Sequence, residues 1–143
     1  MKIIRSHRQT MTLIFLFYFP LVLISCSEPQ TDESLESAIT RHLEQNEFEA
    51  AFERLDAAAT VADSDQDAES ITQLRVQVHL AYGNYLTHEA DHLGMASRMS
   101  DALRHYRRVV QLDPDNTQAR THIELIEGIY DQMGRDIPEG IAD

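Results

Sequence analysis

Apolar residues recur at helical spacing through most of this chain, and no stretch of any length alternates between polar and apolar residues as a strand does. Side chains three or four residues apart share one face of a helix, so each run predicts an amphipathic helix with one buried face. The pattern predicts an all-α domain of about five or six helices. The runs are Leu35, Ala38, Ile39, His42 and Leu43; Phe48, Ala51, Phe52, Leu55, Ala58 and Ala59; Ile71, Leu74, Val78 and Tyr82; and Ile123, Ile126, Ile129 and Tyr130.

Breaker and capping residues divide these runs. The letters NEF interrupt the first pair, which predicts an αα-hairpin, and the acidic loop 63–67 ends it, with Asp67 as the expected N-cap of the next helix. That third helix has few breakers before about Leu93, and Ser100 is the expected N-cap of a helix over 102–112.

Proline and glycine bound the last expected helix. Pro114 ends the preceding helix, and Asn116 or Thr117 can cap the following one. Gly134 stands where a C-cap belongs, so this helix is predicted to stop near Met133. A helical domain over 34–134 therefore leaves residues 135–143 as a C-terminal tail.

The first 25 residues have the pattern of a secretory signal. A basic start precedes the apolar run MTLIFLFYFPLVLIS, which is interrupted by Pro20 and is short for a membrane span. After it, Leu23-Ile24-Ser25-Cys26 resembles the lipobox of bacterial lipoproteins, and this resemblance implies a lipidated Cys26 as the first mature residue. The alternative is an uncleaved anchor helix in which Cys26 is an ordinary residue.

The resemblance to lipoproteins implies an address in the cell envelope. Several acyl chains would hold the protein to a membrane, because one chain alone binds only marginally. Ser27 after the cysteine favours the outer membrane, with the domain facing the periplasm. Residues 26–33 contain no apolar side chain after the cysteine and are expected to form a flexible tether. Since Cys26 is the only cysteine, no disulfide can form within the chain.

The mature part is strongly acidic. Without residues 1–25, 118 residues remain, with nine arginines and no lysine against 24 acidic residues, a formal net charge of −15. This length suits one small domain. The charge repels phosphate backbones and anionic lipid, so we expect no nucleic-acid partner and a membrane attachment that depends on the lipid.

One stretch has the spacing of a helical repeat. In ALRHYRRVVQLDPDNTQAR, Ala102, Tyr106, Val109, Leu112 and Pro114 follow the order small, aromatic, apolar, apolar and helix-ending proline. This order resembles the second helix and the inter-repeat turn of a tetratricopeptide repeat. By the same resemblance, the family's first-helix packing positions fall on Leu86, Ala90 and Leu93.

An earlier stretch, NEFEAAFERLDAA, matches the same repeat more loosely, with Asp63 in place of the proline. The separation of Asp63 and Pro114 exceeds the repeat period of about 34 residues, which implies a lengthened helix or an added turn between them. The resemblance implies a short tetratricopeptide-like array of antiparallel hairpins.

The letters HEADH at 88–92 raise the possibility of a zinc hydrolase. On a helix, His88 and His92 would share one face, with Glu89 as general base. Asp101, His105 or Glu124 could supply a third ligand. However, Asp91 is a charged residue where such proteases carry an uncharged one, and the chain offers no strand to hold a substrate. We therefore expect no enzyme activity, no cofactor and no metal site, with His88 and His92 as the zinc-binding alternative that elemental analysis would test.

Candidate partner-binding residues lie in the middle of the domain. Tyr82, Tyr85 and Met95 can line a concave groove, although aromatic and methionine positions on helices are also typical of cores. Arg104 and Arg108 belong to the basic cluster 104–108, which can bind an acidic peptide or compensate the dipole at a helix C-terminus.

The function that the repeat resemblance implies is non-enzymatic protein or peptide binding at the cell envelope. The partner is expected to be an unknown envelope protein or peptide, and self-association could complete so short an array. A purely structural subunit of an envelope complex is the other alternative. The tail, with Ile137 and Ile141, could pack back on the domain or serve as a docking segment.

Overall fold

A computed structural model describes residues 33–143. The signal segment, Cys26 and nearly all of the expected tether lie outside these residues. The described part is all-α, as predicted, and contains five helices and no strand. They are α1 (Leu35–Glu44), α2 (Phe48–Val61), α3 (Asp65–His88), α4 (Met95–Leu112) and α5 (Thr117–Gln132).

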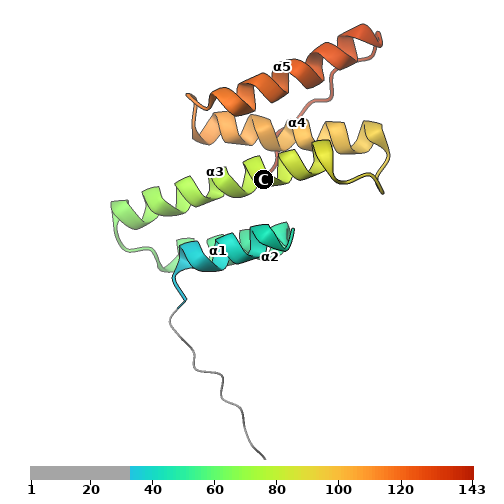
Figure 1. Cartoon of the computed structure of the whole chain (residues 1–143). Coiled ribbons are helices and arrows are strands. Elements are labelled where there is room, and N and C mark those ends of the chain that lie inside the picture. Colours follow the sequence, from blue (N-terminus) through green and yellow to red (C-terminus); the bar gives the residue numbers. More distant parts are fainter. Residues whose placement is uncertain (1–32) are drawn as a thin grey trace, which may run out of the picture. The chain divides into compact units, whose positions relative to one another are not determined.

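Each helix packs against the one before it in the chain, so the five form a series of antiparallel neighbours (Figure 1). The most extensive interface lies between α3 and α4, and α1 also reaches α3. This is the order expected when short loops join amphipathic helices.

Helix α3 is the central helix of the domain, because its side chains belong to both hydrophobic clusters. With 24 residues, it is the longest of the five described helices. The N-terminal half packs with α1 and α2, and the C-terminal half packs with α4 and α5. The first cluster is Ile39, Ala51, Leu55, Ile71, Leu74 and Val78, and the second is Leu86, Ala90, Ala102, Leu103, Tyr106, Val109, Ala119, Ile126 and Tyr130.

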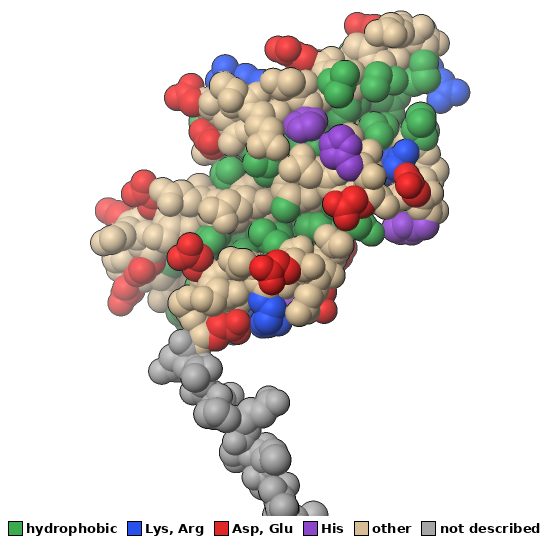
Figure 2. Space-filling view, viewed as in Figure 1, with side chains coloured by type: hydrophobic (Ala, Val, Ile, Leu, Met, Phe, Trp, Pro, Cys, Tyr) green, Lys and Arg blue, Asp and Glu red, His purple; other side chains and the backbone are tan. Residues whose placement is uncertain are grey.

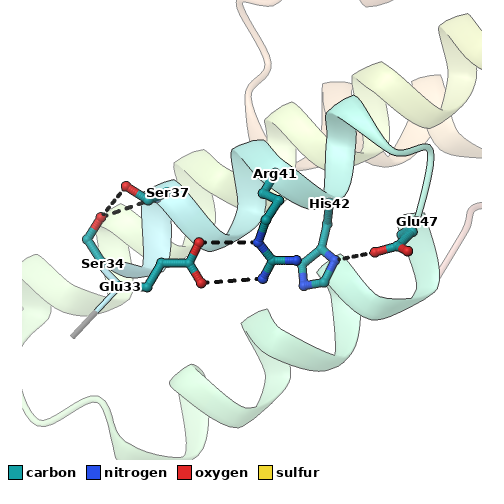
Figure 3. Close-up of polar contacts among 6 residues, drawn as sticks. All are labelled: Glu33, Ser34, Ser37, Arg41, His42 and Glu47. Atoms are coloured by element: carbon teal, nitrogen blue, oxygen red, sulfur yellow. Dashed lines mark hydrogen bonds and ion pairs between the residues drawn. The ribbon is translucent and has the colours of Figure 1, made fainter. Parts of the chain in front are cut away.

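The N-terminus of α1 is fixed by local polar contacts (Figure 3). Ser34 is the N-cap, and its hydroxyl oxygen accepts a hydrogen bond from the backbone N–H of Ser37 at 3.2 Å. The Arg41 guanidinium donates to both carboxylate oxygens of Glu33 at 3.3 Å. At the other end of α1, His42 Nδ1 lies 2.8 Å from a carboxylate oxygen of Glu47. The NEF break is a tight turn in which Asn46 adopts a positive φ of 56°.

The predicted N-cap of α3 was wrong by one turn. Ser64, not Asp67, is the cap: its hydroxyl oxygen accepts from the Asp67 backbone N–H at 3.1 Å. The same hydroxyl donates to the Asp67 carboxylate at 2.6 Å. An acidic residue three positions after a serine cap is a variant of the capping box, and the sequence pattern alone did not separate its two members.

The boundary between α3 and α4 also differs from the prediction. Helix α3 ends at His88 instead of about Leu93, and α4 begins at Met95 after Gly94 instead of at a Ser100 cap. Ala90 remains fully buried in the loop. Periodicity did not reveal this, because Ala90 is buried in the loop, as it would also be one turn after Leu86 in a continued helix.

The last helix follows the prediction. Asn116 caps α5 by accepting from the Ala119 backbone N–H at 3.0 Å. At its C-terminus, Gly134 adopts a positive φ of 63°, and the N–H of Arg135 donates to the Tyr130 carbonyl oxygen at 3.0 Å. This is the Schellman arrangement. From there the tail turns back past α4 towards α3 (Figure 1).

Candidate functional site

A cavity of about 260 Å³ lies where α2, α3, α4 and the tail meet. Its walls combine aromatic rings with both signs of charge, which is the mixture expected of a binding site. The lining residues are Phe52, Tyr82, Asp101, Arg104, His105, Ala142 and Asp143.

Aromatic rings from three helices form the wall of this cavity. The ring of Tyr82 on α3 stacks parallel to that of Phe48 on α2, with centroids 4.4 Å apart. The centroid of the His105 ring on α4 lies 4.4 Å from that of Tyr82, and the two ring planes make an angle of 40°. Phe52 packs against His79 at 4.6 Å. Such contacts fix the rings, so the wall is rigid before any ligand binds.

Tyr82 also has a polar anchor. Its hydroxyl donates to a carboxylate oxygen of Glu49 at 3.2 Å. Burial and the neighbouring Glu49 carboxylate raise the pKa of Tyr82, so the hydroxyl stays protonated and remains a donor.

Two histidines share a hydrogen bond behind the wall. The Nδ1 atoms of His79 and His105 lie 2.9 Å apart, so one ring must donate and the other must accept. Burial lowers the pKa of His79 to about 3 and that of His105 to about 4, and both rings are therefore neutral at pH 7.

The surroundings of His79 favour one arrangement of the two hydrogens. His79 is fully buried, and its Nε2 has no hydrogen-bond partner among the described residues. An unpaired buried acceptor is more common in proteins than an unpaired N–H, which favours a hydrogen on His79 Nδ1. His105 then carries its hydrogen on Nε2, which leaves an N–H on a residue that lines the cavity.

The tail packs back on α4, which is the first of the two possibilities considered for it. The backbone N–H of Ala142 donates to the Arg104 carbonyl oxygen at 3.1 Å. The guanidinium of Arg107 donates to the carbonyl oxygens of Pro138 at 2.6 Å and of Gly140 at 3.4 Å. Only 9% of Ala142 is exposed.

The structure brings together some of the predicted partner-binding residues and separates others. Tyr82 and Arg104 line the same cavity, and Tyr85 lies beside it, with its ring 5.3 Å from that of Phe48. Arg108 instead donates to the side chain of Gln111 at 2.5 Å.

Met95 lies elsewhere, at the start of α4. It lines a separate apolar cavity of about 320 Å³ between α4 and α5, together with Met99, Met133 and Tyr130. Hydrophobic side chains gather on the surface over these two helices (Figure 2). The prediction that Met95 shares a groove with Tyr82 was therefore wrong, because α4 begins earlier than expected and its first turn lies beside the end of α5.

A larger cavity, of about 470 Å³, lies between α1, α2 and α3. Its charged lining residues are Glu36 and Asp67, and no aromatic or basic side chain faces it. Its other polar lining residues are Ser70, Gln73 and Gln77, so it offers neutral polar groups without the aromatic and basic side chains of the smaller cavity.

Sequence reasoning missed Phe48, Phe52, His79 and Ala142. Phe48 and Phe52 are one helical turn apart, so the spacing predicts that they share one face of a helix. The same holds for His79 and Gly83. The meeting of α2, α3, α4 and the tail depends on tertiary packing, which no spacing in the sequence reports.

The geometry assumed for the zinc alternative is absent. His88 is the last residue of α3, and Glu89 to His92 form a turn, so the two histidines do not share one helical face. Asp91 instead accepts a hydrogen bond from Arg98 at 2.8 Å. Within residues 33–143, no three histidine, cysteine or acidic side chains are grouped so that they could hold a metal ion.

Comparison with family models, with curated proteins and with solved structures finds no match to this chain. Among the helices of the described part, none combines the length and the apolar character that a membrane crossing needs.

Proposed function

We propose that this protein binds extended peptide segments of other proteins at the cavity between α2, α3 and α4. The observation that carries the proposal is the seating of a non-helical segment on this surface: residues 137–142 have no regular secondary structure, bond to α4 through their backbone and bury Ala142 at the cavity. A surface that holds one such segment through backbone hydrogen bonds can hold another, because these bonds depend little on sequence.

The chemistry of the cavity supports binding more than catalysis. Its aromatic rings offer apolar contact, and Arg104 and Arg107 offer donors on an otherwise acidic molecule. The Nδ1 atoms of the two neutral histidines pair with each other at 2.9 Å, so neither Nδ1 is arranged as a general base beside a nucleophile.

We place this binding module at the bacterial cell envelope, held by lipid on Cys26. This part of the proposal rests on the resemblance of residues 23–26 to a lipobox and on the polar stretch that follows. The five antiparallel helices are compatible with a short tetratricopeptide-like array, in which stacked hairpins present a rigid curved surface.

A peptide-display selection on the full chain tests the binding function. Peptides that the wild-type protein enriches should bind the Tyr82→Ala variant at least about tenfold more weakly, because the ring forms one wall of the cavity. The Leu125→Ala variant is the matched control, since Leu125 is 56% exposed on α5. Enrichment that is unaffected by Tyr82→Ala, or the failure of any peptide to be enriched, would contradict the proposed function.

A further inference from the structure

The C-terminal tail occupies the surface to which we assign peptide binding. It runs from the end of α5 to the aromatic cavity, and three hydrogen bonds join it to α4. This inference rests on the proposed function, and it concerns which ligands the site accepts and how access is controlled.

Recognition of the tail is mainly recognition of its backbone. A carbonyl oxygen in the interior of a helix has a second lone pair, and that of Arg104 accepts the Ala142 N–H. The Arg107 guanidinium provides charge-assisted donors for the carbonyl oxygens of Pro138 and Gly140. Glu127 accepts from the other terminal nitrogen of Arg107 at 2.8 Å and so orients the guanidinium towards the tail.

A small side chain lies where the tail meets the cavity. Ala142 is buried there, while Ile141 is 41% exposed. Gly140 adopts a φ of 104°, a conformation that other residues rarely reach; the space itself would admit a Cβ, which would lie in ordinary contact 3.6 Å from Arg104 Nε. These constraints define a ligand with a small residue at the cavity and a turn that favours glycine two residues before it.

Charge complements this fit. Residues 136–143 carry Asp136, Glu139 and Asp143 and no base, and they pack against the part of α4 that carries Arg104 and Arg107. On so acidic a chain, these two arginines reduce the repulsion that an acidic segment meets at this surface.

We propose that the tail is a built-in competitor that covers the site until an acidic, extended segment of a partner protein displaces it. A tethered segment acts at an effective concentration of about millimolar, so an outside ligand must bind well enough to overcome it. The partner segment would place a small residue in the aromatic cavity and its carbonyl groups against Arg107.

The test uses a fluorescein-labelled synthetic peptide of residues 135–143, amidated at its carboxyl end, and full-chain protein variants. Ala142→Arg should release the tail, because it puts a long charged side chain at a buried alanine, beside Arg104. Gly140→Ala is a milder second variant that opposes the positive φ. Glu139→Asp is the control, since Glu139 is exposed and the change keeps its charge.

Fluorescence anisotropy should show the peptide binding to Ala142→Arg and to Gly140→Ala at least about tenfold more tightly than to the wild type or Glu139→Asp, as removal of a tethered competitor requires. A peptide carrying the same Ala142→Arg change should lose this affinity. Circular dichroism identifies folded variants, and Gly140→Ala decides the outcome if Ala142→Arg does not fold.

Two results would overturn the competitor role. One is the absence of binding to a folded, released variant, which would make the tail a structural cap. The other is equal binding of display-selected peptides to the wild type and to the released variants. The second result would leave peptide binding itself intact, so failure of this inference is distinguishable from failure of the proposed function.

Discussion

The ring of Tyr106 on α4 lies against the α-carbon of Gly83 on α3, so closely that a methyl group at position 83 would come within 2.8 Å of Tyr106 Cε1. The tyrosine is fully buried, and its hydroxyl donates to the Asn84 side-chain oxygen at 2.9 Å. On its other face, the ring stacks on His122 of α5 at 4.6 Å. This contact sets how closely α3 and α4 approach beside the cavity that Tyr82 and Arg104 line.

Gly83→Ala should destabilise the domain by about 1–3 kcal/mol, because the new methyl group must displace a ring that is held on every side. Chemical denaturation measures the loss. Gly128→Ala is the matched control: Gly128 is also inside a helix, but its Cβ would meet nothing within 4 Å. Alanine there should leave stability unchanged or raise it by up to about 1 kcal/mol. Equal effects of the two substitutions would refute the close-packing account.

Lowering the pH should destabilise the protein through the His79–His105 pair. In the unfolded chain both groups have a pKa near 6.5, whereas in the folded protein their pKa values are lowered to about 3 and about 4. Between about pH 4 and pH 6.5 the unfolded chain binds more protons than the folded protein. The stability that the neutral pair contributes is therefore complete above about pH 6.5 and declines as the pH falls towards about 4. The charged groups facing the pair are Arg75, Arg108, Asp101, Arg104 and Glu49.

Denaturation midpoints at several pH values measure this effect. His79→Leu should flatten the decline between pH 6.5 and about 4, because one of the two groups no longer titrates. His92→Asn is the control, since His92 is exposed in the loop after α3. An unchanged slope in His79→Leu would show that the acidic surface groups, and not the pair, set the pH dependence.

Ser64→Ala should cost about 1 kcal/mol of stability, since it removes the cap that accepts the Asp67 N–H. Ser97→Ala, at an exposed position inside the first turns of α4, should have an effect within about 0.5 kcal/mol. Thermal unfolding compares the two variants. A larger loss from Ser97→Ala would place the important cap elsewhere.

Arg107→Gln should loosen the tail, because it weakens the bonds to the Pro138 carbonyl oxygen and to Glu127. Hydrogen exchange should then become faster at the Ala142 amide, whose acceptor is the Arg104 carbonyl. Arg120→Gln removes a pair with Asp115, which is fully exposed, and should leave exchange in the tail unchanged. Unaltered protection of Ala142 in both variants would contradict the role given to Arg107.

The sequence predicted the helical class because apolar spacing directly reports which face of each helix is buried. It also limited the cap of α5 to Asn116 or Thr117 and predicted the end of this helix near Met133, where single residues decide the local geometry. It could not predict that Gly83 receives Tyr106, because a glycine inside a helix looks the same whether or not a ring packs on it.

The candidate site was only partly predictable for a related reason. Tyr82 and Arg104 were chosen as single aromatic and basic residues, and tertiary packing placed them in one cavity. Met95 was assigned to the same groove because the start of α4 was expected several residues later. His79 contacts His105, which is 26 residues away in the chain, and Ala142 contacts Arg104, which is 38 residues away. Helical periodicity does not report contacts between segments so far apart.

The central claim is that other proteins bind at the cavity between α2, α3 and α4. Site-specific photocrosslinking of the full chain in native envelopes tests it most directly, with the crosslinking amino acid at Tyr82 and, as control, at Leu125 on α5. The account predicts that position 82 captures an extended segment of another protein, identified by mass spectrometry, and that position 125 does not. Crosslinks from position 82 that reach only the protein's own tail, or identical products from both positions, would contradict it.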